Sequence, residues 1–249
     1  MSPSMKLFVF PHSHFCEKAQ WALDYKGAAS ETVAVVPGFH IVTLSRYAPG
    51  TMVPLLLDGS KSVQGSGEII DYLDQKMPER PLTPSDEALR LECVALEDDA
   101  ERRIGKPLRT MLYSWLLDHP AFLRKCFTHS MPPYKKVLFD LVRPILFYKI
   151  HQIYVKSPQY VERARGDFDA VMVELAERVA AKPYLVGDQF SRADLAVASL
   201  LSLLVLPDEH PFPWGDVPDE RVRLFMDEFR DHPVSEWVRE IYRQHRGAA

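Results

Sequence analysis

The chain has 249 residues, 47% of them hydrophobic and 26% charged, and its 30 Lys and Arg against 34 Asp and Glu give a net charge of -4. This is the composition of a soluble globular protein of one or two domains, and it excludes a disordered chain, a collagen-like fibre and a coiled-coil array. Without an excess of basic residues, a general electrostatic affinity for nucleic acid is not expected.

The N-terminal part alternates short apolar or β-branched runs with two segments of helical periodicity. The expected strands are residues 6–10, 31–36, 53–57 and the run around 62–63, and the expected helices are residues 14–26 and the segment that begins at 65–66. Gly27 ends the first helix, and Asp58-Gly59 is a turn signal between the last two strands. The order β-α-β-loop-β-β-α predicts helices packed on a small mixed sheet.

The remainder of the chain is expected to be helical, after a proline-rich linker at residues 80–85 that divides domains 1–80 and 86–249. The expected helices are residues 89–117, 134–155, 163–181, 191–206 and 221–245. Gly105 and Pro107 should bend or divide the first of these helices.

No membrane span and no disulfide framework are expected. The longest apolar run, residues 195–206, has roughly 12 residues where a span needs about 20, so it predicts a buried core helix. Three scattered cysteines indicate a protein of a reducing compartment, and we expect it to be cytoplasmic.

Residues 11–16 (PHSHFC) lie where the first strand meets the first helix. The backbone N–H groups and the dipole of a helix N-terminus favour an anion and lower the pKa of a thiol held there. The Ser13 hydroxyl can donate a hydrogen bond to a ligand thiolate, or it can simply cap the helix. Cys16 is either a second reactive group or a buried structural thiol. His12, His14 and Cys16 alternate as zinc ligands would, but a fourth ligand is missing, so no metal is expected.

Two further segments offer backbone groups to a ligand. A cis bond between Val53 and Pro54, after Met52, would leave the Val53 N–H and C=O available to a peptide-like ligand, whereas base rates favour an ordinary trans proline. At the start of the next helix, Gly65 permits close approach of a ligand. Ser66 and the N–H groups after it form either a carboxylate-binding nest or a plain cap.

Together these segments resemble the glutathione S-transferase family over nearly the whole chain. Val53-Pro54 matches the family's cis-proline step, and residues 64–66 (QGS) followed by 69–73 (IIDYL) match the segment that holds the γ-glutamyl end of glutathione. Residues 187–195 (GDQFSRADL) match the family's N-capping box, in which a serine caps the helix and an aspartate three residues later reaches back. The resemblance implies an α/β thioredoxin-like N-terminal domain, which binds glutathione, and an all-α C-terminal domain with the acceptor-substrate pocket.

The resemblance also implies a function. The chain would be a glutathione transferase and a homodimer, with glutathione as co-substrate, a small electrophile as its other partner, and no metal. Ser13 would activate the glutathione thiol, and Cys16 is the alternative catalytic residue. The implied glutathione contacts are His14, Phe15, His40, Met52, Val53, Pro54, Gly65 and Ser66.

The sequence departs from the family pattern in three places. Phe8 and Phe10 stand where tyrosine-dependent members end the first strand with tyrosine, and Gly65 stands where many members carry Glu or Gln. The stretch 118–157 is longer than the usual connection and is expected beside the acceptor pocket. Two other functions therefore stay open: a glutathione-dependent thiol oxidoreductase that uses Cys16, and a non-catalytic glutathione-binding or scaffold protein.

Overall fold

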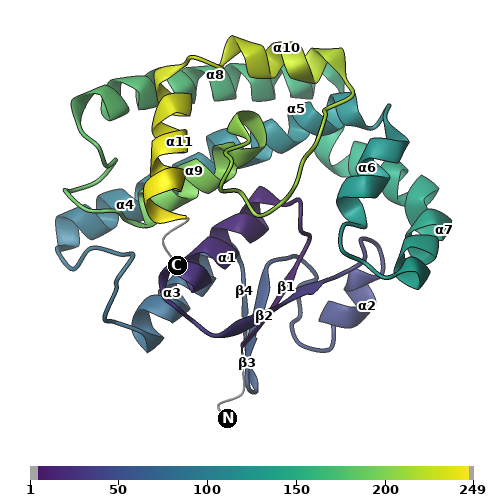
Figure 1. Ribbon diagram of the computed structural model, residues 1–249, viewed down its shortest axis with the longest axis horizontal. Coiled ribbons are helices and arrows are strands. Elements are labelled where there is room, and N and C mark those ends of the chain that lie inside the picture. The colour runs from purple at the N-terminus through teal and green to yellow at the C-terminus, as the bar shows by residue number, and fades with distance from the viewer. Residues whose placement is uncertain (1–4, 247–249) are drawn as a thin grey trace.

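The computed structural model describes residues 5–246, and its first part is a four-stranded sheet with three helices (Figure 1). The elements are β1 (Met5–Val9), α1 (His14–Tyr25), β2 (Ser30–Ala34), α2 (His40–Leu44), β3 (Leu55–Asp58), β4 (Lys61–Gln64) and α3 (Ser66–Lys76). The strand order is β2-β1-β3-β4, with β1 parallel to β2 and antiparallel to β3, and β3 antiparallel to β4.

Side chains along each strand point alternately to the two faces of the sheet, and each face packs in a different hydrophobic core. Leu7 and Leu56 are fully buried in the large core that also contains residues of α1 and α3. Phe8 and Leu55 point to the opposite face, where they join a smaller cluster with Leu44 of α2. The sheet is therefore covered on both faces, by α1 and α3 on one and by α2 on the other.

The second part is entirely helical among the described residues. Its elements are α4 (Glu87–Ala100), a π-helical turn (Glu101–Gly105), α5 (Lys106–Leu116), α6 (Pro120–Phe127), α7 (Pro133–Ile150), a second π-helical turn (His151–Val155), α8 (Pro158–Ala181), α9 (Arg192–Val205), α10 (Glu220–Glu228) and α11 (Pro233–His245). Helix α9 is buried along almost its whole length and packs against α1, α4 and α11 (Figure 1). None of the described helices is long and apolar enough to cross a membrane.

This architecture confirms the predicted fold class, and it corrects the predicted elements in three places. Helix α2, of five residues, lies in a segment that was expected to be a loop. Helix α6 lies in the long connection before α7 and begins at Pro120. The single helix expected over 221–245 is divided in two, because His232 caps a new helix whose first residue is Pro233.

The predicted capping box at the start of α9 is present and wholly buried. One Asp194 carboxylate oxygen accepts the Leu185 N–H at 2.7 Å, and the other accepts the N–H and the hydroxyl of Ser191, both at 2.9 Å. Burial raises the pKa of Asp194 to about 6, and these hydrogen bonds oppose that rise. The box thus fixes the entry of the most buried helix in the protein.

Replacing Asp194 by alanine is expected to lower the free energy of unfolding by about 1 kcal/mol, the usual cost of a damaged cap. The Leu185 and Ser191 N–H groups would lose their acceptor. Chemical denaturation followed by circular dichroism measures the change. Ligand affinity per folded molecule should stay the same, so an unaltered midpoint with lost binding would contradict a purely structural role.

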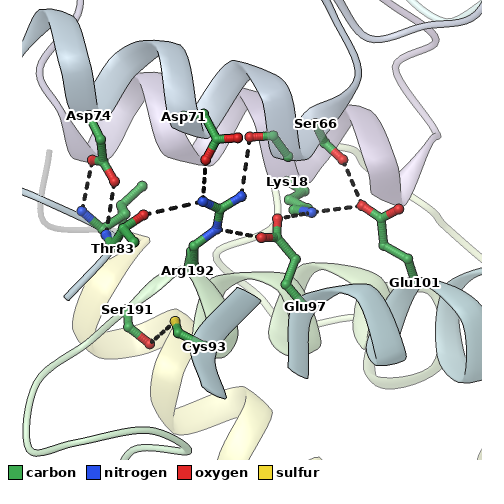
Figure 2. Close-up of polar contacts among 12 residues, drawn as sticks. Lys18, Ser66, Asp71, Asp74, Thr83, Cys93, Glu97, Glu101, Ser191 and Arg192 are labelled. Carbon is green, nitrogen blue, oxygen red and sulfur yellow. Dashed lines mark hydrogen bonds and ion pairs between the residues drawn. The ribbon is translucent and has the colours of Figure 1, made fainter. Parts of the chain in front are cut away.

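A buried ion network joins α3 to the helical part (Figure 2). Arg192, at the first turn of α9, has a side chain only 4% exposed and pairs with Glu97 of α4 and Asp71 of α3. Its Nη2 also donates to the Gly67 carbonyl at 3.3 Å. One guanidinium therefore joins the first turns of α3, the last turn of α4 and the start of α9.

The network continues through α1 to the first π-helical turn. Lys18, which is fully buried, pairs with Glu97 and, at 2.8 Å, with Glu101 (Figure 2). Glu101 in turn accepts a hydrogen bond of 3.2 Å from the Ser66 hydroxyl. The first residue of α3 is thereby tied to the long helical rod formed by α4, the π-helical turn and α5.

Candidate functional site

A cavity of about 810 Å³ opens between the two parts of the molecule. Its first wall consists of the loop between β1 and α1 and of residues 37–42 and 51–53. Its second wall comes from α5, α6 and α7 and from side chains between residues 203 and 226. The lining is mainly aliphatic and aromatic, which is typical of a small-molecule site. The long 118–157 stretch supplies much of the second wall.

Ser13 lies on the first wall at the N-terminus of α1. It is the N-cap residue by backbone conformation, yet its hydroxyl makes no capping hydrogen bond. Its N–H donates to the Phe10 carbonyl at 2.9 Å, which fixes the turn into the helix. The first N–H groups of α1 have no intrahelical acceptor, as in any helix. Together they make this wall favourable for an anion.

Cys16, the alternative catalytic residue, is in the core and does not line the cavity. Its exposed fraction is 3%. Burial raises the pKa of its thiol to about 12, although hydrogen bonds with Ser13 and the Phe10 backbone oppose the rise. A thiol of that pKa is protonated at neutral pH and is a poor nucleophile. Burial and the raised pKa favour the structural interpretation of Cys16, and its role as the alternative catalytic residue stays a prediction.

His14 and Phe15 lie on the wall beside the first π-helical turn. His14 is buried, and its Nε2 is 3.1 Å from the Gly105 carbonyl. Burial, followed by the charge of Arg109, lowers the pKa of His14 to about 3, so the ring is neutral. A Cβ at Gly105 would lie 2.8 Å from Phe15 Cζ and 2.9 Å from Leu200 Cδ2. Glycine at this position thus permits the close approach of α1 and α9 to the rod.

The Val53-Pro54 bond is cis, as the resemblance implies, although most bonds before proline are trans. Val53 and Met52 line the cavity, and the Met52 side chain is largely exposed. The Met52 carbonyl accepts a hydrogen bond of 2.7 Å from Gln64 Nε2, and the Pro54 carbonyl accepts the Gly65 N–H at 3.1 Å. The proline segment is in this way joined to the start of α3.

Gly65 and Ser66 do not line the cavity. Gly65 has a φ of 108°, which a residue with a side chain rarely adopts, and a Cβ there would meet the Glu68 carboxylate. Ser66 is 5% exposed, and its hydroxyl bonds to Glu101 (Figure 2). The backbone N–H groups of the first turn of α3 have no intrahelical acceptors, as at the start of any helix.

His40 begins α2 and lines the cavity on the side away from α3. Its Nδ1 accepts the Gly38 N–H at 3.0 Å, and its ring packs edge-on against Phe10. Burial lowers the pKa of His40, so the ring is neutral at neutral pH. The other ring nitrogen is left for a ligand.

The described residues contain no group of three or more His, Cys, Asp or Glu side chains placed to hold a metal ion. Sequence reasoning missed most of the second wall. Arg109, Lys149 and Trp214 line the cavity from three separated segments. Helical periodicity marks α5 and α7 as amphipathic but does not say which of their residues meet the N-terminal loop.

Two family models match this chain. The one described as "Glutathione S-transferase, N-terminal domain" matches residues 7–81, and the one described as "Glutathione S-transferase, C-terminal domain" matches residues 158–239. A curated relative, the glutathione S-transferase zeta class protein of Euphorbia esula, is 30% identical over 91 residues. That match covers 34% of this chain and 39% of the relative.

Solved structures of similar fold cover nearly the whole chain. The beta-etherase of Sphingobium sp. strain SYK-6 is 20% identical with a TM-score of 0.63, over 98% of this chain and 100% of that one. A glutathione transferase of Phanerochaete chrysosporium is 17% identical with a TM-score of 0.65, over 96% of both chains. A glutathione S-transferase of Methylobacillus flagellatus KT, solved with glutathione bound, is 17% identical with a TM-score of 0.63, over 95% and 93%.

Proposed function

The chain belongs to the glutathione S-transferase family, and on that premise we propose that it is a glutathione transferase that activates the thiolate of glutathione for attack on a small electrophile. The observation that carries the proposal is the uncapped Ser13 hydroxyl on the wall of the large cavity. A hydroxyl that is not used in capping, beside the N-terminus of α1, suits a ligand anion. The glutathione bound in the Methylobacillus flagellatus structure supports the choice of ligand.

We propose that glutathione lies along the first wall in an extended form. Its thiol would approach Ser13, and its central peptide would pair with the backbone of Val53. Its γ-glutamyl carboxylate would meet the N–H groups at the start of α3, where the helix dipole favours an anion. Its glycine carboxylate would lie toward His40. The rest of the cavity, lined by α5, α6 and α7, would receive the electrophile.

In this reaction the protein lowers the pKa of the glutathione thiol, so that more of the glutathione is present as the thiolate. A free thiol has a pKa near 8.5 and is mostly protonated at neutral pH. A hydrogen bond from Ser13 to the sulfur stabilises the thiolate and so lowers its pKa. The thiolate then forms a carbon–sulfur bond with the electrophile, and the displaced electron pair leaves with the leaving group or enters the conjugated π system of the electrophile. The cavity holds both reactants in contact.

The thiol oxidoreductase alternative is weaker, because its reaction needs an accessible thiolate and Cys16 is buried with a raised pKa. A non-catalytic binding protein stays the competing hypothesis, and it would bind glutathione without making a product.

A homodimer is also a prediction, which light scattering of the purified protein tests.

The first test compares glutathione binding by the parent protein and by Ser66→Ala in a calorimeter. We expect binding by the parent and an affinity about threefold lower in the variant, since the hydroxyl helps to order the start of α3 against Glu101. Ser62→Ala, the same change at an exposed serine of β4 that does not line the cavity, is the control and should match the parent. Chromatography of the products of glutathione and 1-chloro-2,4-dinitrobenzene then separates an enzyme from a binding protein. A parent protein that binds no glutathione would overturn the proposal.

A further inference from the structure

The charged residues that line the cavity are all basic. Among the described residues that form its walls there are two full cations, Arg109 of α5 and Lys149 of α7, and there is no aspartate or glutamate. The whole chain, by contrast, has an acidic excess. Lys149 is exposed, whereas Arg109 is half-buried. The cavity therefore has a positive character that the protein as a whole lacks.

Arg109 is held in place by aromatic rings. Its guanidinium carbon lies 4.1 Å from the centre of the Tyr154 ring and 5.6 Å from that of Phe15. Its Nε is buried without a hydrogen-bond partner, and no ion pair to Arg109 is found within the described part of the chain. The other cation nearby would be His14, but burial keeps that ring neutral. Arg109 is thus a positioned cation with no carboxylate partner among the described residues.

A second donor on the same walls is in the same condition. The indole Nε1 of Trp214 is buried and has no acceptor among the described residues. Guanidinium and indole N–H groups can only donate hydrogen bonds. Buried donors of this kind are usually satisfied, and leaving a charged one unpaired is costly. A cation that no described carboxylate neutralises, on the wall of an apolar cavity, indicates a ligand that brings the anion.

We infer that the second substrate of this protein is an aromatic compound that carries an anionic group, a carboxylate or a phenolate, and that Arg109 binds this group. The inference rests on the proposed function for the reaction, but the binding itself does not require glutathione. The aromatic residues of the cavity wall pack against the ring of such a compound, and the guanidinium of Arg109 donates hydrogen bonds to its anionic group. Because glutathione also has carboxylates, the test must tell the two sources of the anion apart.

The experiment uses a matched pair of probes, 1-naphthoate and 1-naphthamide, which share a ring system and differ in charge. Binding of each to the full-length protein is measured by calorimetry without glutathione. The parent should bind naphthoate at least tenfold more tightly than naphthamide. In Arg109→Met the naphthoate affinity should fall about tenfold while the naphthamide affinity changes less than twofold. Arg109→Lys, which keeps the charge without the fork, should retain part of the preference.

Lys106→Met is the matched control, since Lys106 is an exposed cation on the same helix and does not line the cavity. It should behave as the parent does. Equal affinity of the parent for the two probes would overturn the inference, and this comparison needs no variant to fold. A loss of glutathione affinity in Arg109→Met, with the naphthoate preference kept, would assign the anion to glutathione and also overturn it. A parent that binds naphthoate but not glutathione would instead remove the proposed function alone.

Discussion

Alanine at position 13 is expected to slow the conjugation of glutathione with 1-chloro-2,4-dinitrobenzene at least tenfold. The hydroxyl of Ser13 has no capping bond to lose, so the fold should be little affected. Without that donor the thiol of bound glutathione returns toward its free pKa, and a tenfold loss corresponds to about 1.4 kcal/mol. Because a raised pKa leaves less thiolate at each lower pH, the acid limb of kcat/KM should move to higher pH.

Cys16→Ser is the informative companion to this variant. The Cys16 thiol is buried, so its replacement should leave kcat/KM within about twofold of the parent and the pH profile in place. The reverse ranking, with an inactive Cys16→Ser protein and disulfide-reductase activity in the parent, would establish the thiol oxidoreductase instead.

Replacing Arg192 by methionine is expected to cause the largest loss of stability, a decrease of about 3 kcal/mol in the free energy of unfolding. Methionine keeps most of the volume of the side chain but leaves Glu97, which is 3% exposed, without its main partner. Removal of one member of a buried ion pair costs about 3–5 kcal/mol because the remaining charge stays buried. Lys18 still pairs with Glu97, which favours the lower end of that range. Guanidinium denaturation of both proteins measures the difference.

Arg178→Met provides the contrast, since Arg178 pairs with Glu92 on the surface and both side chains are more than 40% exposed. Solvent-exposed pairs contribute about 0–1 kcal/mol, so this variant should unfold at nearly the same denaturant concentration as the parent. If both arginine variants lost the same small amount, the network between α3, α4 and α9 would not be the connection inferred from its burial.

The parts of the fold that were predicted correctly are those with strong local signals. Asp58-Gly59 between two apolar runs specifies a hairpin turn, and Ser191 followed by Asp194 specifies a helix start, so short stretches suffice. Helix α2 was missed because five residues without a capping side chain carry no periodicity to detect. The division at Pro233 was visible in principle, since proline favours the first turn of a helix.

The candidate site was predictable on one wall only. The first wall comes from continuous segments next to Ser13 and Val53, whose residue types indicate ligand contacts by themselves. The second wall depends on how helices far apart in the sequence pack against that loop, and Arg109 has no local feature that separates it from any surface arginine. The hydrogen bond from the Ser66 hydroxyl to Glu101, a residue that lies 35 positions away, likewise has no local signal in the sequence.

The π-helical turn Glu101–Gly105 sets the rotational phase of the rod that runs from α4 to α5. At 3.6 residues per turn, the twelve positions from Glu97 to Arg109 would put the two side chains about 120° apart around the axis. One residue absorbed by the wider turn reduces this to about 20°. The same side of the rod can therefore present Glu97 to the buried ion network and Arg109 to the cavity. A single-residue deletion within the turn would rotate all of α5 relative to α4, so this segment should tolerate a substitution of the exposed Arg102 far better than a change in length.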